Sequence, residues 1–415
     1  MNSKREFYKT PQAMEPLFPE GDIRLLEHLA IELIERSGRL ESCMHPITKK
    51  AVAEILRPMN SYYSNLIEGH DTHPIEIAKA LKNDYSTDKT KRDLQLEALA
   101  HINLHREITE QFNSASAPCP VSEVFIKGIH EQFYRHLPTD FRYVYSKEGQ
   151  IREVIPGAYR TEEVEVGRHI GPYSGSIDSF MDRFVTYYKP SAVVQHAKVR
   201  QVISIAASHH RLAWIHPFLD GNGRVVRLFS DACFLSENLN TNGLWSISRG
   251  LSRNNSAYKV KLANADLIRF NDYDGRGNLS NKMLIEFCTF FLQTAIDQVN
   301  YMLNVLDIDH MLARIQAFTD LMVSRRKLKS EARYILADVF MKGKISKSDA
   351  ERVSNLSDKT AKIMTDTLEE MGLLRKEKEG IHMMYYVNYS IQLSPLFFPG
   401  LYPNDKELEM ILSIQ

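Results

Sequence analysis

The sequence predicts an all-α protein in which strands are few and short. Apolar residues recur with helical spacing along most of the chain, whereas the apolar–polar alternation that is typical of strands is scarce. Hydrophobic residues make up 43% of the chain and charged residues 25%, which are the proportions of an ordinary globular protein. With 415 residues, the chain is long enough for two or three domains.

The first region, residues 1–115, is predicted to be helical. Its helices are expected over residues 22–40, 47–57, 61–67 and 94–112. Pro58 is expected to interrupt the second helix, because proline lacks the backbone N–H that a helix interior needs. Gly69 is expected to end the third helix, since glycine readily takes the left-handed conformation of a helix C-terminus. The polar residues 84–93 are interpreted as a loop.

The second region is expected to begin near a stretch rich in Ser, Ala and Pro, residues 113–120, and to extend over residues 116–318. Helices are predicted over residues 121–137, 176–188, 191–214, 224–236, 256–271 and 280–318. The least helical part of the chain lies between the first two of these helices. There, Val154 to Gly157 has the composition of a turn, and the alternation from Thr161 to Gly167 favours a short strand.

The third region, residues 325–395, is predicted to form a winged helix-turn-helix, because three helices are followed by a β-hairpin. The first helix is expected over 331–342, and helix starts are indicated at Ser330, Ser346 and Ser357. The hairpin strands are expected over 373–376 and 381–387, with a turn at Gly380. Residues 396–415 are interpreted as a C-terminal tail.

Overall composition narrows the functional classes. The formal net charge is zero, so nothing global indicates binding to nucleic acid or to an acidic membrane. The four cysteines are too widely spaced for a zinc pattern or a disulfide framework. The first residues lack the apolar stretch of a signal peptide, and no apolar run approaches the roughly 20 residues of a membrane span. A cytoplasmic protein without a membrane partner is expected.

One stretch, His216 to Arg227, combines groups that phosphate chemistry uses. It reads His-Pro-Phe-Leu-Asp-Gly-Asn-Gly-Arg-Val-Val-Arg and follows an apolar helix. Gly221 to Gly223 can turn backbone N–H groups toward one concavity at the start of the next helix, where the helix dipole favours anions. Arg224 and Arg227 are three residues apart, so they share one helix face and can neutralise a polyphosphate.

Three other residues of this stretch supply chemistry. His216, if neutral near pH 7, can accept a proton from an attacking hydroxyl. Asp220 suits a Mg²⁺ ion that bridges phosphate oxygens, and the Asn222 amide can donate to a phosphoryl oxygen. The stretch therefore predicts attack of a hydroxyl on phosphorus. It is neither a Walker loop nor a protein-kinase motif, because the residues that define those motifs are missing.

This stretch resembles the signature of the Fic family, His-x-Phe-x-(Asp/Glu)-Gly-Asn-Gly-Arg-x-x-Arg, at all positions that the signature fixes. The resemblance implies a helical core with a short hairpin flap, and transfer of AMP from ATP to a hydroxyl side chain of a target protein. It implies the following roles: His216 as base, Asp220 as Mg²⁺ ligand, Gly221, Asn222, Gly223 and Arg224 as the anion hole for the α- and β-phosphates, and Arg227 as partner of the γ-phosphate.

Two further segments resemble parts of that family. Pro156 to Arg160, followed by Val164 to Pro172, resembles the flap, a hairpin that covers the site and aligns a target segment by strand addition. Its central residues are Val166, Gly167, Arg168 and His169. Tyr258, downstream of Ser248-Arg249, resembles the region that closes over adenosine, and a role as a core aromatic residue is an equal alternative. The resemblance covers about residues 50–300.

Ser64 to Gly69 fits the inhibitory motif (Ser/Thr)-x-x-x-Glu-(Gly/Asn) of many Fic proteins, on a helix expected over about 59–69. Its place before the catalytic core resembles the N-terminally inhibited class. Ser64 and Glu68 are four residues apart and therefore face the same side of a helix. A Glu68 carboxylate directed at Arg227 takes the place intended for the γ-phosphate. The alternative is that Glu68 is an ordinary residue of the last helical turn.

Two functions remain open from the sequence. The first is an autoinhibited adenylyltransferase that uses ATP and Mg²⁺, acts on Ser, Thr or Tyr of an unidentified target protein, modifies itself, and also removes AMP. The second is a DNA-binding regulator whose Fic core senses nucleotide. Lys359 and Lys362 on the expected recognition helix are accompanied by several acidic residues, so protein contact or support of a homodimer is favoured over DNA binding.

Overall fold

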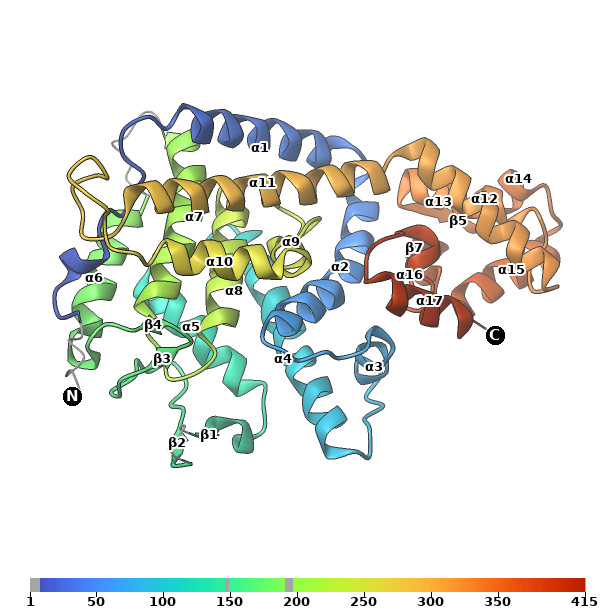
Figure 1. Cartoon of the computed structure of the whole chain (residues 1–415). Coiled ribbons are helices and arrows are strands. Elements are labelled where there is room, and N and C mark those ends of the chain that lie inside the picture. Colours follow the sequence, from blue (N-terminus) through green and yellow to red (C-terminus); the bar gives the residue numbers. More distant parts are fainter. Residues whose placement is uncertain (1–7, 146–148, 191–196, 415) are drawn as a thin grey trace.

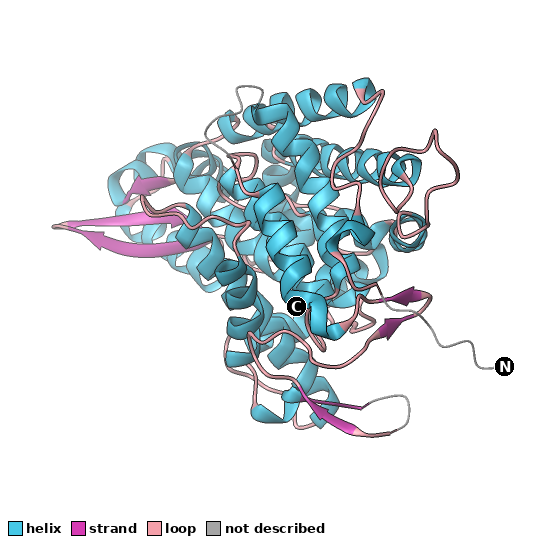
Figure 2. Cartoon of the chain, turned by 90° about the vertical axis from the view of Figure 1, so that its left-hand side faces the viewer, coloured by secondary structure: helices cyan, strands magenta, loops and turns pink. Residues whose placement is uncertain are grey.

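A computed structural model describes residues 8–145, 149–190 and 197–414. Helices make up most of this part of the chain, and the strands form three small sheets at the periphery (Figure 2). The predicted all-α class is therefore confirmed. Within these three ranges, no helix is both long enough and apolar enough to cross a membrane.

The N-terminal region packs around the central helices (Figure 1). It contains the short 3₁₀ helix η1 (Pro11–Met14), then α1 (Arg24–Ser42), α2 (Pro46–Ile67), α3 (Pro74–Ala80) and α4 (Lys89–Phe112). Helix α1 lies along α11 (Asn281–Val305), and α2 contacts both α4 and α9 (Ile247–Arg253). The N-terminal region is thus part of the same packed unit as the candidate catalytic core.

Two adjacent helices, α7 (Ala197–Ile215) and α8 (Asn222–Ser236), flank the candidate catalytic loop and pack against each other. The surrounding helices are α5 (Glu123–Arg135), α6 (Ile177–Tyr188), α9, α10 (Asn255–Asn264) and α11. Fully buried phenylalanines, among them Phe218, Phe229 and Phe234, fill the space between them. Of the helix expected over 191–214, residues 191–196 lie outside the described ranges.

Several expected boundaries were wrong. Pro58 does not interrupt a helix: α2 runs through it, and packing of its largely buried central turns offsets the backbone hydrogen bond that proline cannot make. The helix expected over 280–318 is two helices, because Asp307 caps a new one, α12 (Ile308–Ser324), by accepting from the His310 N–H at 3.1 Å. Glu331, rather than Ser330, precedes the next helix.

Other boundaries differ by a few residues. The loop expected over 84–93 ends at Asp88, whose carboxylate caps α4 by accepting from the Lys91 N–H at 2.9 Å. The helix expected over 256–271 ends at Asn264, and the preceding α9 was not foreseen. The apolar pattern alone did not reveal the Asp88 cap or the short helix α9, so these boundaries were misplaced.

Two pairs of short strands lie at the same edge of the helical core (Figure 1). Strands β1 (Tyr143–Tyr145) and β2 (Ile151–Glu153) form one antiparallel pair that was not predicted. Strands β3 (Glu165–Val166) and β4 (His169–Ile170) form a second pair, which occupies the predicted flap and is shorter than the strand expected over 161–167. Two further 3₁₀ turns are η2 (Thr139–Arg142) and η3 (Ser174–Ser176).

The C-terminal part contains the expected helices and hairpin. Its elements are α12, α13 (Ala332–Lys342), β5 (Lys344–Ser346), α14 (Lys347–Ser354), α15 (Asp358–Glu370), β6 (Leu374–Glu379), β7 (His382–Val387), α16 (Ser394–Phe397) and α17 (Asn404–Leu412). The strands form an antiparallel sheet in the order β5-β7-β6. Ser346 caps α14 together with Asp349 in a capping box, as the sequence indicated. The assignment as a winged helix-turn-helix stays a prediction.

This C-terminal part packs against α2 (Figure 1). The Thr48 hydroxyl donates to the Phe340 carbonyl at 2.8 Å, and the Tyr62 and Tyr402 rings meet edge to face with centroids 5.6 Å apart. Residues 396–415 are therefore not a loose tail over the described range, because Phe398, Leu401 and Tyr402 are buried. Helix α2, which carries the inhibitory motif, is held from both sides.

A buried acid between α2, α4 and α8 makes stability depend on pH. Burial raises the pKa of Asp231 to about 7, and its carboxylate accepts a hydrogen bond from the Asn60 amide at 3.1 Å. A raised native pKa stabilises the fold fully below the unfolded-state value and loses that contribution as pH rises through the native value. Asp231→Asn should therefore gain stability relative to wild type as pH rises from about 4 to 7.

The check is the difference in unfolding free energy between Asp231→Asn and wild type, from urea titrations at several pH values. Asparagine keeps the shape and an acceptor for Asn60 but does not titrate, so other groups cancel in the difference. A difference that stays constant over this pH range would contradict the assignment.

Candidate active site

The candidate catalytic loop is a tight turn between α7 and α8. His216 follows the last residue of α7 with a left-handed backbone (φ 50°), and Gly221 takes a left-handed conformation (φ 77°) immediately before α8. Left-handed backbone is favourable for glycine and uncommon for other residues, so Gly221 suits this position. The turn places Gly221 to Arg224 at the N-terminus of α8, where backbone N–H groups and the helix dipole favour an anion.

Asn222 holds this turn together. Its side-chain oxygen accepts from the Phe218 N–H at 2.9 Å, and its amide nitrogen donates to the Phe218 carbonyl at 2.8 Å. Phe218 is fully buried and stacks on His130, with ring centroids 4.1 Å apart. The buried Asn222 side chain is thus engaged by the loop backbone, and the expected bond from its amide to a phosphoryl oxygen stays a prediction.

His216 is held in its neutral form. Burial, with smaller contributions from nearby His169 and Arg160, lowers the pKa of His216 to about 3. Its backbone carbonyl accepts from the Arg160 Nε at 2.8 Å. A neutral imidazole keeps a nitrogen lone pair that can accept a proton from a hydroxyl.

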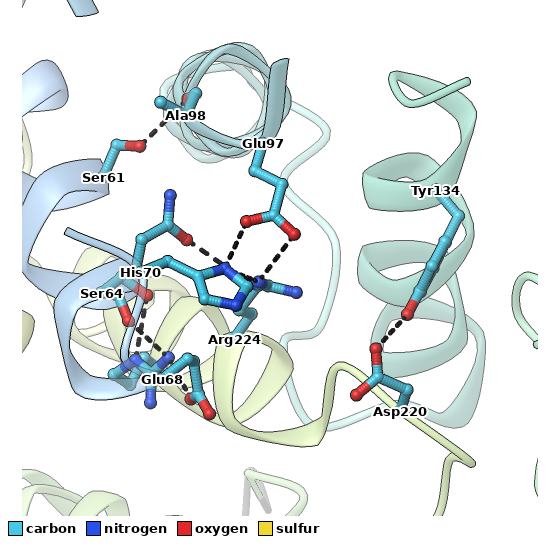
Figure 3. Close-up of polar contacts among 11 residues, drawn as sticks. Ser61, Ser64, Glu68, His70, Glu97, Ala98, Tyr134, Asp220 and Arg224 are labelled. Atoms are coloured by element: carbon cyan, nitrogen blue, oxygen red, sulfur yellow. Dashed lines mark hydrogen bonds and ion pairs between the residues drawn. The ribbon is translucent and has the colours of Figure 1, made fainter. Parts of the chain in front are cut away.

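Asp220 is oriented by two residues that the sequence did not reveal. The Tyr134 hydroxyl donates to Asp220 Oδ2 at 2.8 Å (Figure 3). His130 Nε2 lies 3.2 Å from the Asp220 carbonyl. His130 Nδ1 accepts from the Gly157 N–H at 2.8 Å, so His130 ties the loop to the base of the flap. Burial lowers the pKa of His130 to about 4, consistent with a neutral ring that accepts on one side and donates on the other.

The surroundings of Asp220 fit a magnesium ion that arrives with its substrate. Mg²⁺ is commonly held by one or two carboxylates together with substrate phosphates and water. Asp220 is half-buried beside the N-terminus of α8, and Tyr134 engages only one of its two carboxylate oxygens. Over the described ranges, no group of three or more acidic, histidine or cysteine side chains forms a ready metal cage.

Arg227 is buried and bound by the inhibitory motif. Its Nε donates to the Ser64 hydroxyl at 2.9 Å, and its Nη2 donates to the Ser64 carbonyl at 2.9 Å and to Glu68 Oε1 at 2.7 Å. Burial alone would raise the pKa of Glu68, and the ion pair with Arg227 nevertheless holds it below its usual value. A side chain at Gly223 would overlap the Glu68 carboxylate, so this carboxylate lies against the first turn of α8.

Arg224 is bound by a second set of N-terminal residues, also unforeseen. Its Nη2 lies 3.2 Å from Glu97 Oε1 and 3.2 Å from His70 Nδ1, and its Nε lies 3.4 Å from Asn65 Oδ1 (Figure 3). The other oxygen of Glu97 contacts His70 Nδ1. Arg224 and Glu97 are 7% and 8% exposed, respectively, so this pair is buried within the protein.

The flap is attached to the catalytic loop at two points. His169 on β4 lies 3.0 Å from Asp266 Oδ2 through Nδ1 and 2.8 Å from the Trp214 carbonyl through Nε2. Arg160, 3% exposed, donates to the carbonyls of His216, Glu162 and Pro172 at 2.8, 2.8 and 2.7 Å. Val166, Gly167 and Arg168 are exposed at the tip, as a segment that meets a partner must be.

Tyr258 lies in the core behind this site. Its hydroxyl is 2.9 Å from His209 Nε2, and the side chain is 5% exposed. His209 also contacts the Ser230 hydroxyl at 2.8 Å through Nδ1 and is fully buried, so it is a core histidine. A nucleotide-binding role for Tyr258 stays a prediction.

The sequence thus predicted the loop and the contact of Glu68 with Arg227, but not the residues that support them. His130 and Tyr134 are four residues apart on α5, and Glu97 lies in the middle of α4. Each is polar within an apolar helical pattern, which was the only available signal. No spacing in the sequence links them to a loop about 90 or more residues away.

Comparisons with known proteins agree with this geometry. A family model described as the Fic/DOC family matches residues 120–233. "Protein adenylyltransferase Fic" of Drosophila sechellia and that of Drosophila melanogaster are each 33% identical over 175 residues, which is 42% of this chain and 31% of each relative. The match thus spans about a third of the length of these relatives.

A solved structure supports the fold. A crystal structure of a Fic family protein from Desulfovibrio desulfuricans G20 matches with a TM-score of 0.50 at 14% identity. The match covers 89% of this chain and 98% of that one. The similarity of fold therefore extends well beyond residues 120–233.

The low pKa of His216 can be tested directly. His216 should remain neutral from about pH 5 to 8, because protonation would place a charge in a buried site beside Arg160. The measurement is a pH titration of ¹⁵N-labelled histidine side chains by NMR, with the His216 signals identified by their loss in His216→Ala. A His216 signal that titrates between pH 6 and 7, the range of about pH 6.5 for a free imidazole, would contradict this.

Proposed function

We propose that this chain, which carries a Fic/DOC family domain over residues 120–233, transfers AMP from ATP to a hydroxyl side chain of a target protein and is held inactive by Glu68. One observation carries this proposal: a neutral His216 begins the loop that leads into the N-terminus of α8, whose first turns carry the buried Arg224 and Arg227. The relatives named as protein adenylyltransferases support the chemistry.

The chemistry begins with removal of a proton. His216 accepts the proton of a Ser, Thr or Tyr hydroxyl, and the oxygen attacks the α-phosphorus of ATP. A new P–O bond to the target forms while the bond to the β-phosphate breaks, and pyrophosphate leaves. The N-terminus of α8, with Gly221 to Arg224, faces the phosphates and favours their charge. Removal of AMP by the same site would be a separate hydrolysis: water gives up a proton, its oxygen attacks the phosphorus of the AMP ester, and the P–O bond to the target breaks as the target oxygen takes up a proton and AMP leaves.

A bound Mg²⁺ would neutralise phosphate charge during this transfer. Asp220 is the residue that would hold it, and Tyr134 orients that carboxylate. Arg227 would meet the γ-phosphate once Glu68 has left it. The flap, with Val166 to His169, would align the target segment by strand addition next to His216.

The inhibition follows from the same contacts. Glu68 and the γ-phosphate are both anions that require the same guanidinium group. Arg227 is buried and already bound by Glu68, so both anions do not fit there together. While Glu68 occupies Arg227, ATP binds weakly or with its phosphates displaced. Glu68 directly follows the last residue of α2 and its side chain is 36% exposed, so it is able to move aside.

Two further proposals concern the C-terminal part and the location of the protein. The C-terminal part is proposed to be a winged helix-turn-helix that contacts protein or supports a homodimer, and the cytoplasm is the proposed location. DNA binding gains no support from α15, since Lys347 pairs with Asp358 and Lys376 pairs with Asp366 and Glu369 around it. A mobility-shift assay would separate a DNA-binding regulator from an enzyme.

Removal of the inhibitory carboxylate should activate the protein. Glu68→Gly is expected to increase self-modification by AMP by roughly 5- to 150-fold, the range of a typical coupling energy between two sites. The measurement is mass spectrometry after incubation with each nucleoside triphosphate and Mg²⁺, which identifies donor, transferred group and modified residue together. Glu370→Gly, at the exposed end of α15, is the matched control. Equal incorporation in both variants would overturn the inhibitory role.

Removal of the base should abolish transfer but not binding. In the Glu68→Gly background, His216→Ala should lower the transfer rate by about 10²- to 10⁴-fold, the usual contribution of a general base. ATP affinity, measured by calorimetry, should change little, because His216 makes no contact with the arginines that bind phosphate. Undiminished transfer by the double variant would remove His216 from the role of base.

A further inference from the structure

We propose that Glu97 is a positioning residue for Arg224, and that His70 links this pair to the inhibitory segment. The proposal rests on the proposed function, in which Arg224 binds ATP phosphates. Glu97 lies on α4, far from the signature in sequence and outside the range of the family match. Its carboxylate bridges two side chains, with one oxygen for Arg224 and the other for His70 (Figure 3).

Burying the Arg224 guanidinium is energetically costly. A guanidinium that is 7% exposed loses most of its hydration, and a buried charge is stable only when it is paired. Glu97 supplies the opposite charge at 3.2 Å, and the Phe133 ring lies 5.0 Å from the guanidinium carbon. Burial alone would lower the pKa of Arg224, and the carboxylates of Glu97, Asp220 and Glu68 raise it instead.

The second step distinguishes Glu97 from Glu68. Glu68 follows the last turn of α2 and its side chain is 36% exposed, whereas Glu97 sits in the middle of α4 with a side chain that is 10% exposed. The backbone of Glu97 is fixed within a 24-residue helix, so it is less able than that of Glu68 to carry its side chain away. The Glu97–Arg224 pair therefore orients the guanidinium rather than competing with ATP for it.

The third step concerns His70. It lies two residues after Glu68, and its Nδ1 contacts Glu97 while the same atom is 3.2 Å from Arg224 Nη2. The hydrogen bond with Glu97 raises the pKa of His70, which strengthens this contact. The groups around His70 are Glu97, Arg224 and Glu68. The contact holds the segment from Glu68 to His70 against the Glu97–Arg224 pair. Loss of His70 should therefore make it easier for Glu68 to leave Arg227.

The test compares nucleotide binding and transfer in the active background. Glu97→Gln, added to Glu68→Gly, keeps the shape and an acceptor but removes the charge. It should weaken binding of ATP about tenfold or more, leave binding of adenosine unchanged, and lower AMP transfer. A loss of stability without positioning would weaken both ligands alike. Glu110→Gln, exposed on the same helix, is the matched control.

If Glu97→Gln raises AMP transfer in the Glu68→Gly background, Glu97 is a second inhibitor rather than a positioning residue. If Glu97→Gln leaves ATP binding unchanged, Glu97 has no positioning role. Failure of the proposed function gives a different result. If the Glu68→Gly protein binds ATP but transfers no AMP, the transfer chemistry fails and the binding comparison still decides the role of Glu97. If that protein binds no ATP, both proposals are overturned.

A second variant tests the link independently. His70→Gln with Glu68 intact should increase AMP incorporation severalfold, since the inhibitory segment loses a contact. The same change in the Glu68→Gly background should have little effect, because no inhibitor remains to be released. Equal effects in both backgrounds would mean that His70 acts on Arg224 alone, and no effect in either would overturn the link.

Discussion

The buried guanidinium of Arg227 is the constraint on which the rest of this site depends. It is 1% exposed, so it needs an anionic or strongly accepting partner in every state of the protein. Ser64 and Glu68 supply that partner here, and a phosphate is the partner that the proposed reaction requires. Because one buried cation cannot be left unpaired, exchange between two partners is the natural behaviour of the site.

The inhibitory position depends on packing more than on charge. The segment after Glu68 is joined to α17 by Asp71–Lys406 and His73–Glu409 at 3.2 and 2.9 Å, and several of these side chains are well exposed. Exposed pairs of this kind contribute roughly 0–1 kcal/mol each. The buried faces of α2 against α4, α9 and the C-terminal part contribute far more contact. These packed surfaces set where Glu68 lies, and the ion pairs refine it.

Features encoded within a short segment could be predicted from the sequence, whereas contacts between distant residues could be predicted only where a motif resemblance linked them. Apolar spacing and the signature were enough for the helical class, the loop from His216 to Arg227 and the hairpin of the flap, because each is encoded within a short segment. The contact between Glu68 and Arg227 joins residues 159 apart, and it was predicted because each residue belongs to a motif that resembles one of the Fic family. Pro58 misled because tertiary packing outweighs one missing backbone bond. Glu97 was missed because its partner is 127 residues away, and only the fold brings the two together.

The partners of the two arginines also define what the catalytic unit is. The family match begins at residue 120, yet the side chains named above that bind Arg224 and Arg227 through hydrogen bonds and ion pairs all precede residue 98. A segment limited to the matched range would lose these partners together with helices α2 and α4, which pack against α8. The N-terminal helices are therefore not a separable regulatory addition. They complete the electrostatics of the site, and for Arg227 the inhibitory contact is also the contact that makes its burial stable.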